Sequence, residues 1–152
     1  FARKYLPEKT RIDKDKRALD LVNRDDFKAI LDDSGLSAEQ KVRLLGRYSH
    51  NTPNLILSSQ VTDFEKILET PTLWAELKWA ARHEQVIHLD DLLLRRTRIG
   101  SLLPQGSLPI MQQIRKICQP QLDWDDARWQ AEVLAYQQLY AQSYSLPQPL
   151  TA

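Results

Sequence analysis

Histidines, one cysteine and a cluster of arginines are the side chains in this sequence whose types and spacing could support chemistry. His83 and His88 lie five residues apart in HEQVIH, one residue longer than the zinc-binding pattern HExxH. On a continuous helix, with about 100° of rotation per residue, the two imidazoles would point about 140° apart. We therefore expect no shared metal ion here unless the helix breaks near Val86.

Cys118 is the only cysteine, so the sequence contains neither an intrachain disulfide nor a cysteine-based zinc site. A nucleophilic thiol needs an electropositive, partly exposed setting. Cys118 instead follows Ile110, Ile114 and Ile117 at helical spacing, which predicts a place in the core. A single free thiol also fits a reducing compartment.

The four glycines, Gly35, Gly46, Gly100 and Gly106, are too far apart to bring several backbone N–H groups to one phosphate. They form neither a dinucleotide fingerprint nor a phosphate-binding loop. We therefore predict no catalytic, cofactor-binding or metal-binding residue within this chain.

The chain has 152 residues, the size of one domain, with ordinary hydrophobic and charged fractions and a net charge of +1. No apolar run approaches the roughly 18 residues of a membrane span, and the basic N-terminus lacks the apolar core of a signal peptide. We divide the chain into a basic linker or N-terminal arm (1–24), a helical domain (25–145) and a flexible tail (146–152). Because the chain starts at Phe1, we expect it to be processed or cut from a longer polypeptide.

Few glycines, few β-branched clusters and abundant Leu, Ala, Gln, Arg and Glu favour helix. We predict an all-α fold, a compact bundle of about six to seven helices. The expected helices cover residues 25–33, 38–49, 52–61, 70–84, 89–103, 107–119 and 124–143. Their expected end signals are Gly35, Ser37 with Gln40 as a capping box, Thr52-Pro53, Thr70-Pro71, Ser107, Pro120 and Asp123.

The last of these helices carries two apolar stripes, which predicts contacts on two sides. One stripe holds Trp124, Ala127, Ala131 and Leu134, and the other holds Trp129, Val133, Tyr136 and Tyr140.

The stretch LDDLLLRRTR is the most distinctive part of the sequence. If residues 89–103 form one helix, Arg96 lies within the apolar stripe, where a guanidinium needs a partner. We expect Glu84 or Glu76 in that role, and an ion pair between Asp91 and Arg95 four residues apart. The alternative is contact of these arginines with an anion or a nucleic acid, but the interleaved aromatic residues of single-strand binders are missing.

These residues also carry a family resemblance. The run from Trp74 to Arg98 is similar to the C-terminal domain of FAD-dependent glycerol-3-phosphate dehydrogenases, a family that includes the alpha-glycerophosphate oxidases. The matching motif residues, for which we predict structural roles, are Tyr48, Glu84, Asp91, Arg95, Arg96, Thr97, Arg98 and Trp124. Arg128, Glu132 and Tyr136 fit the family's last helix. Two positions depart from the pattern: Ser49 replaces a glycine after Tyr48, and His88 replaces the threonine that starts a helix.

The resemblance implies a parent flavoprotein that oxidises glycerol 3-phosphate to dihydroxyacetone phosphate and passes electrons to a quinone or to oxygen. FAD and substrate would bind an N-terminal domain of the same polypeptide, and this domain would buttress that part or serve assembly. We expect a cytoplasmic location, with the parent peripheral to the inner membrane. A free-standing helical protein-interaction module and a nucleic-acid binder using residues 1–17 and 95–98 are the alternatives; for the leading interpretation we expect no nucleic-acid partner.

Overall fold

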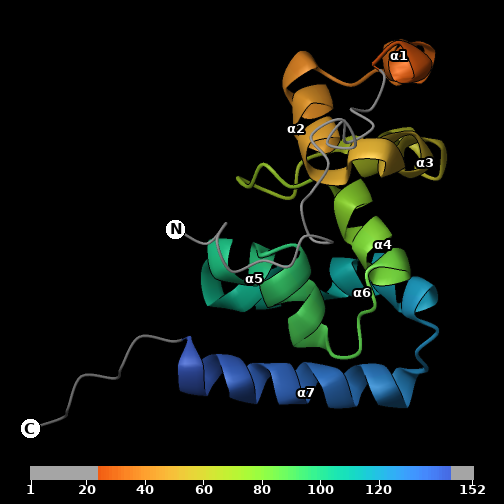
Figure 1. The fold of residues 1–152 in the computed structure, drawn as a ribbon. Helices are drawn as coiled ribbons and strands as arrows, with labels where there is room; N and C mark the ends of the chain where they lie inside the picture. The colour runs from red at the N-terminus through yellow and green to blue at the C-terminus, as the bar shows by residue number, and fades with distance from the viewer. Residues whose placement is uncertain (1–23, 145–152) are drawn as a thin grey trace, which may run out of the picture. The chain divides into compact units, whose positions relative to one another are not determined.

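The computed structural model describes residues 24–144, and describes side chains from Lys28 onward. The proposed basic linker (apart from Arg24) and the flexible tail lie outside these residues. Within them the fold is all-α, with seven α-helices and short 3₁₀ and π segments (Figure 1). The predicted fold class is therefore confirmed. None of the described helices is long and apolar enough to cross a membrane.

The chain divides into two units, residues 1–54 and 55–152. In the described part of the first unit, α1 (Arg24–Asp33) and α2 (Ala38–Tyr48) precede a 3₁₀ turn, η3 (Ser49–Asn51). The predicted capping box is present, because Ser37 accepts from the Gln40 N–H and Gln40 accepts from the Ser37 N–H. Val42 is exposed, and Leu44 is the buried residue of this helix beside Tyr48.

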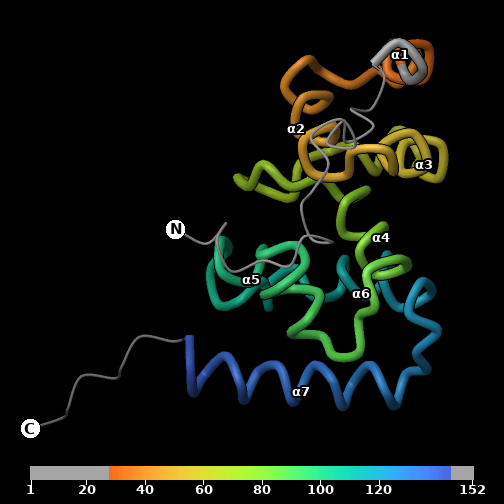
Figure 2. Tube along the Cα trace, in the orientation of Figure 1, coloured from red at the N-terminus to blue at the C-terminus, as the bar shows by residue number. Residues whose placement is uncertain are grey.

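The helix α3 (Thr52–Leu57) begins at the predicted Thr52-Pro53 and leads into the second unit. There follow η4 (Val61–Phe64), α4 (Trp74–His83), the π-helical η5 (Asp91–Arg96), α5 (Ile99–Leu102), η6 (Pro104–Ile110), α6 (Met111–Leu122) and α7 (Asp126–Ser143). Their core includes Leu77, Leu89, Ile99, Ile114 and Trp129. Figure 2 shows the chain descending from α4 toward α7 before it turns back into η5.

The predicted helix start at Thr70-Pro71 is wrong, because these residues close a tight turn. The Thr70 hydroxyl donates to the Ile67 carbonyl at 2.8 Å, and the Ile67 N–H donates to the Thr72 carbonyl. The helix begins instead at Trp74, where Glu76 accepts from the Leu73 N–H at 3.1 Å. A carboxylate three residues into the helix therefore replaces the predicted proline start.

The predicted continuous helix 89–103 is also wrong. Thr97 donates its N–H to the Leu92 carbonyl, five residues back, and Arg98 then takes a left-handed conformation with φ +61°. In this wider turn the chain closes on the fifth residue and not the fourth, so the side chains after Leu92 do not keep the rotational phase of an α-helix. Arg96 is therefore exposed, and its predicted burial in the apolar stripe is wrong.

Three predicted helix ends are displaced. Ser107 lies in a left-handed run with Gln105 and Gly106, so α6 begins at Met111. Pro120 removes one N–H from the last turn without ending α6, which continues to Leu122. Asp123 closes α6 with φ +54°, and Asp125 caps α7 by accepting from the Arg128 N–H at 2.7 Å.

Candidate functional site

The family-motif residues of the second unit lie around the segment that joins α4 to η5. Glu84, half-buried, ends α4, and Gln85 follows with φ +52°, so the helix breaks just before Val86. One oxygen of Asp91 then accepts from the N–H groups of His88 at 3.0 Å and Ile87 at 3.2 Å. Asp91 therefore caps the helical turn that starts at Leu89, supplying acceptors for N–H groups that have no partner within the helix.

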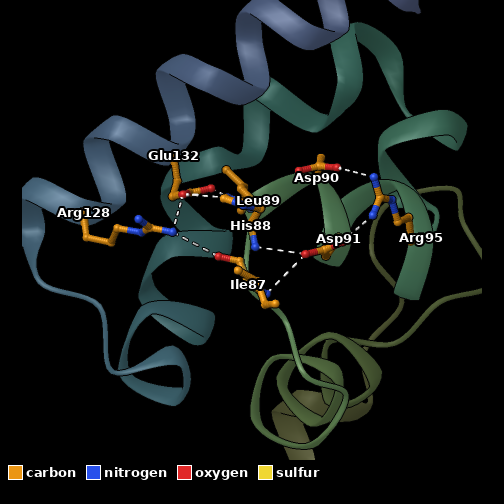
Figure 3. Close-up of polar contacts among 8 residues, drawn as sticks. All are labelled: Ile87, His88, Leu89, Asp90, Asp91, Arg95, Arg128 and Glu132. Atoms are coloured by element: carbon orange, nitrogen blue, oxygen red, sulfur yellow. Dashed lines mark hydrogen bonds and ion pairs between the residues drawn. The ribbon is translucent and has the colours of Figure 1, made fainter.

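Glu132 of α7 reaches the same helix end from the opposite side (Figure 3). Its carboxylate accepts from the Leu89 N–H at 2.9 Å and lies 3.1 Å from His88 Nδ1. Leu89 is fully buried, and the Glu132 side chain is 7% exposed. A carboxylate more than forty residues away in sequence therefore completes the cap and joins α7 to the start of η5.

Arg128, one helical turn before Glu132, holds this carboxylate in place. Its guanidinium lies 2.7 Å from Glu132 Oε1 and also donates to the Ile87 carbonyl at 3.2 Å. It stacks over the ring of Trp124, 5.4 Å from the centroid. Trp124 therefore orients the arginine that bridges α7 and the loop.

Asp91 is ionised more readily than an ordinary carboxyl group. Burial raises its pKa, but hydrogen bonds from the His88 and Ile87 backbone and the charge of Arg95 outweigh that effect, so the pKa is lowered. Arg95 contacts Asp91 at 2.9 Å, as predicted from their spacing, and Asp90 at 3.2 Å. Arg95 is thus paired with both aspartates at the start of η5.

Thr97 closes the π turn from the other end. It is buried, and its hydroxyl donates to the Leu92 carbonyl at 2.6 Å, the same oxygen that receives its N–H. Arg96 and Arg98 point outward on either side of it. The expected pairing of Arg96 with Glu84 or Glu76 stays a prediction, although Glu76 is fully buried and Arg96 is not.

The tyrosines of α7 extend its contact with the core. Tyr136 is buried, its hydroxyl donates to the Gly106 carbonyl at 2.8 Å, and burial raises its pKa, with a smaller effect from Tyr140. A methyl group added at Gly100 would lie 2.5 Å from that hydroxyl. The predicted stripe of Trp129, Val133, Tyr136 and Tyr140 is buried or half-buried and forms the inner side of α7, as expected. Ala127, Ala131 and Leu134 of the other predicted stripe are exposed.

Tyr48 belongs to the first unit, where it is buried and Arg47 lies 5.6 Å from its ring centroid. The next residue, Ser49, has φ +49° and ψ −121°, a conformation that strongly favours glycine. The sharp turn is therefore made although the family's glycine is replaced.

The side chains that could act as nucleophiles or metal ligands are not arranged for either role in the described part of the chain. Cys118 is buried, as predicted, and burial raises the pKa of its thiol. No group of three metal-ligating acids, histidines or cysteines occurs among residues 24–144.

A groove of about 730 Å³ runs past Asp63, Glu65, Lys78 and Lys116, with Asp63 and Lys78 paired at 2.9 Å. Its mixed charges do not concentrate one sign for a phosphate group.

His88 and Glu132 form a carboxylate–imidazole pair, which the sequence could not reveal because the two residues are 44 positions apart. The His88 side chain is 59% exposed, but Glu132 also accepts from Leu89 and Arg128. Sharing its charge among three donors favours anchoring over activation of a base. This contact also explains how the helix start tolerates His88 in place of threonine, because Asp91 and Glu132 supply the caps.

Asp91, Arg95 and Thr97 thus lie at η5. Trp124 contacts Arg128, which reaches the loop before η5, and Glu84 ends the preceding helix. Glu132 and Arg128 matched the family's last helix in sequence, but their contacts with the loop before η5 were not predicted. A signal was present, because Glu132 is an acid within the inner stripe between Trp129 and Tyr136, and Arg128 precedes it by four residues.

Comparison with known proteins agrees with the resemblance carried by these residues. The family model described as the C-terminal domain of alpha-glycerophosphate oxidase matches residues 18–129. No curated protein and no solved structure gives a significant match.

Proposed function

Since the chain belongs to the family described as the C-terminal domain of alpha-glycerophosphate oxidase, we propose that it is the helical accessory domain of a FAD-dependent enzyme that oxidises glycerol 3-phosphate. The parent reaction removes two electrons and two protons from the substrate carbinol, giving dihydroxyacetone phosphate and reduced flavin. FAD and substrate bind the N-terminal domain of the same polypeptide. The present domain contributes no catalytic group and buttresses that part.

The contacts made by the family-motif residues are the observation that carries this proposal. Asp91 and Thr97, two of its positions, are occupied in hydrogen bonds to backbone groups of η5 and of the loop before it. Arg95 is held by two aspartates. Side chains arranged in this way fix the shape of a helix and its loop, which is what a scaffold requires.

Location and electron acceptor follow from the parent enzyme. We propose that it works on the cytoplasmic side and associates peripherally with the inner membrane through another part of the polypeptide. A quinone would be the acceptor in a dehydrogenase, and oxygen in an oxidase. Measuring oxygen consumption against reduction of a quinone analogue separates the two.

The proposal is tested on the full open reading frame. We expect the complete polypeptide to be yellow and to oxidise glycerol 3-phosphate, and the 152-residue chain alone to be colourless and inactive. Removing residues 24–144 from the complete polypeptide should lower its thermal stability and flavin retention. A reading frame that starts near Phe1, or flavin absorbance in the isolated chain, would overturn the proposal and favour a free-standing interaction module.

A further inference from the structure

A run of left-handed residues joins α5 to α6. Gln105, Gly106 and Ser107 have φ values of +52°, +66° and +68°, and Arg98, at the other end of α5, has φ +61°. In a residue with a side chain this conformation brings Cβ close to the following carbonyl oxygen, so glycine alone adopts it without strain. Residues 98–107, which we call the strained segment, therefore contain three strained positions, Arg98, Gln105 and Ser107.

A buried hydroxyl group adds to the cost of this conformation. Ser107 is 1% exposed, and its Oγ has no hydrogen-bond partner among the described residues. Such a group destabilises the folded state, because the same hydroxyl binds water when it is exposed. Opening of the strained segment relieves both the backbone strain and the burial of this hydroxyl.

The local sequence favours a different conformation at the start of the strained segment. Its apolar spacing predicted one helix over residues 89–103, yet Arg98 breaks that helix, and α5 retains four residues, Ile99–Leu102. A helix of one turn has little stability of its own, because its first hydrogen bond requires the ordering of three residues. Contacts with neighbouring elements, and not local preference, therefore hold the strained segment in place.

Two tyrosines of α7 provide such contacts. The buried Tyr136 hydroxyl donates to the Gly106 carbonyl at 2.8 Å. A methyl group added at Gly100 would lie 2.5 Å from the same hydroxyl, and one added at Gly106 would lie 2.6 Å from the Tyr140 ring. The backbone at both glycines of the strained segment therefore lies directly against α7.

The elements on either side of the strained segment are anchored without it. Glu132 accepts from the Leu89 N–H, and Thr97 closes the π turn on the Leu92 carbonyl. Cys118 of α6 is fully buried, 4.0 Å from a carbonyl oxygen of α4. Release of the strained segment thus leaves the capped start of η5 and the contact between α4 and α6 intact.

We propose that the strained segment opens as a unit before the rest of the second unit unfolds, and that the Tyr136 hydroxyl is the latch that keeps it closed. Opening brings the Gly106 carbonyl and the buried side chains of Ile99 and Leu103 into water. Elements that move in lids and switches are drawn from segments that open at low free energy. The inference does not rest on the proposed function, because every group involved belongs to the second unit of this chain.

Native-state hydrogen exchange in the 152-residue chain, followed by NMR, measures this opening. The Leu103 N–H donates to the Ile99 carbonyl at 2.9 Å and reports on the strained segment. The Cys118 N–H, within α6, reports on unfolding of the whole second unit. After correction for intrinsic rates, we expect Leu103 to exchange at least about tenfold faster than Cys118, which places the open state about 1.4 kcal/mol or more below the unfolded state.

Three variants test the latch and the strain. Tyr136→Phe leaves the buried Gly106 carbonyl without its donor, so exchange at Leu103 should become about tenfold faster. Tyr140→Phe is the matched control: its hydroxyl forms no hydrogen bond among residues 24–144, and the rate should stay within about twofold. Ser107→Ala removes the buried hydroxyl and should slow exchange at Leu103 by at least about fivefold.

Glu132→Ala separates opening of the strained segment from a general loss of stability. The cap that it removes is retained when the segment opens, so exchange at Leu103 should not change, whereas exchange at Cys118 should become at least about tenfold faster. Tyr136→Phe should accelerate both, because its hydrogen bond is lost in the open and the unfolded state alike. Equal exchange of Leu103 and Cys118 in the wild type, equal acceleration of both by Glu132→Ala, or no effect of Tyr136→Phe at Leu103 would overturn the inference.

Discussion

Replacing Glu132 by alanine is the most direct test of the cap that α7 supplies to another helix. The change leaves the N–H of the fully buried Leu89 without an acceptor and releases His88 and Arg128. An unsatisfied buried backbone group costs about 1–3 kcal/mol, and the lost ion pair with Arg128 adds about 0.3–0.5 kcal/mol. We expect the free energy of unfolding of the second unit to fall by about 2–3 kcal/mol.

Urea unfolding followed by tryptophan fluorescence suits this measurement. The four tryptophans, at positions 74, 79, 124 and 129, all belong to the second unit, so the signal reports on that unit alone. Glu132→Gln keeps an acceptor for Leu89 and loses only the charge, so about 1 kcal/mol is expected. Gln137→Ala on the exposed side of α7 should change stability by less than about 0.5 kcal/mol.

The comparison with Arg128 decides between two interpretations of the carboxylate. If Glu132 matters only through its ion pair, Glu132→Ala and Arg128→Ala will have equal, small effects of at most about 1 kcal/mol, as for exposed pairs. A capping role predicts that Glu132→Ala costs clearly more than Arg128→Ala. Equal effects would refute the reasoning.

Three further predictions concern other described positions. Folding lowers the pKa of Asp91, so the carboxylate's contribution to the free energy of unfolding is fully present above about pH 4 and is lost as the pH falls through the folded value. Urea unfolding should show Asp91→Asn to be less stable than wild type at neutral pH, and this difference in stability should shrink below about pH 4. Gly100→Ala should destabilise the second unit by about 1–3 kcal/mol in the same assay, and by less in a Tyr136→Phe background, where the colliding hydroxyl is absent. Ser49→Gly should raise the stability of the first unit by about 1 kcal/mol in thermal unfolding followed by circular dichroism, because its backbone has φ +49°; an unchanged melting temperature would contradict the assigned strain.

Helices whose ends are fixed by short-range chemistry were predictable from the sequence. Ser37 with Gln40 and Thr52-Pro53 act within one turn, so reading the local residues was enough. Thr70-Pro71 carries the same signal but lies in a turn, because the Thr70 hydroxyl bonds backward to Ile67. Local propensity could not choose between these two uses of the same dipeptide.

The site was predictable in part for a related reason. The Asp91–Arg95 pair depends on four-residue spacing, which a π turn brings together as well as an α turn does. The exposure of Arg96 depends on the rotational phase of the helix expected over residues 89–103. The π turn closed by Thr97 changed that phase. Glu132 was unassigned because its main partner, Leu89, is 43 residues away, beyond any helical period.

The two halves of α7 are held in place by different kinds of contact. Asp126, Arg128 and Glu132, in its first half, are engaged with α6 and with the loop before η5, so charge is used to fix the position and rotation of the helix. From Val133 onward the helix has no charge, and its inner side is held by Tyr136 through neutral contacts. Loss of the Glu132 cap should therefore loosen the first half of α7 more than the second, and equal amide hydrogen-exchange rates in the two halves of that variant would show that they open as one unit.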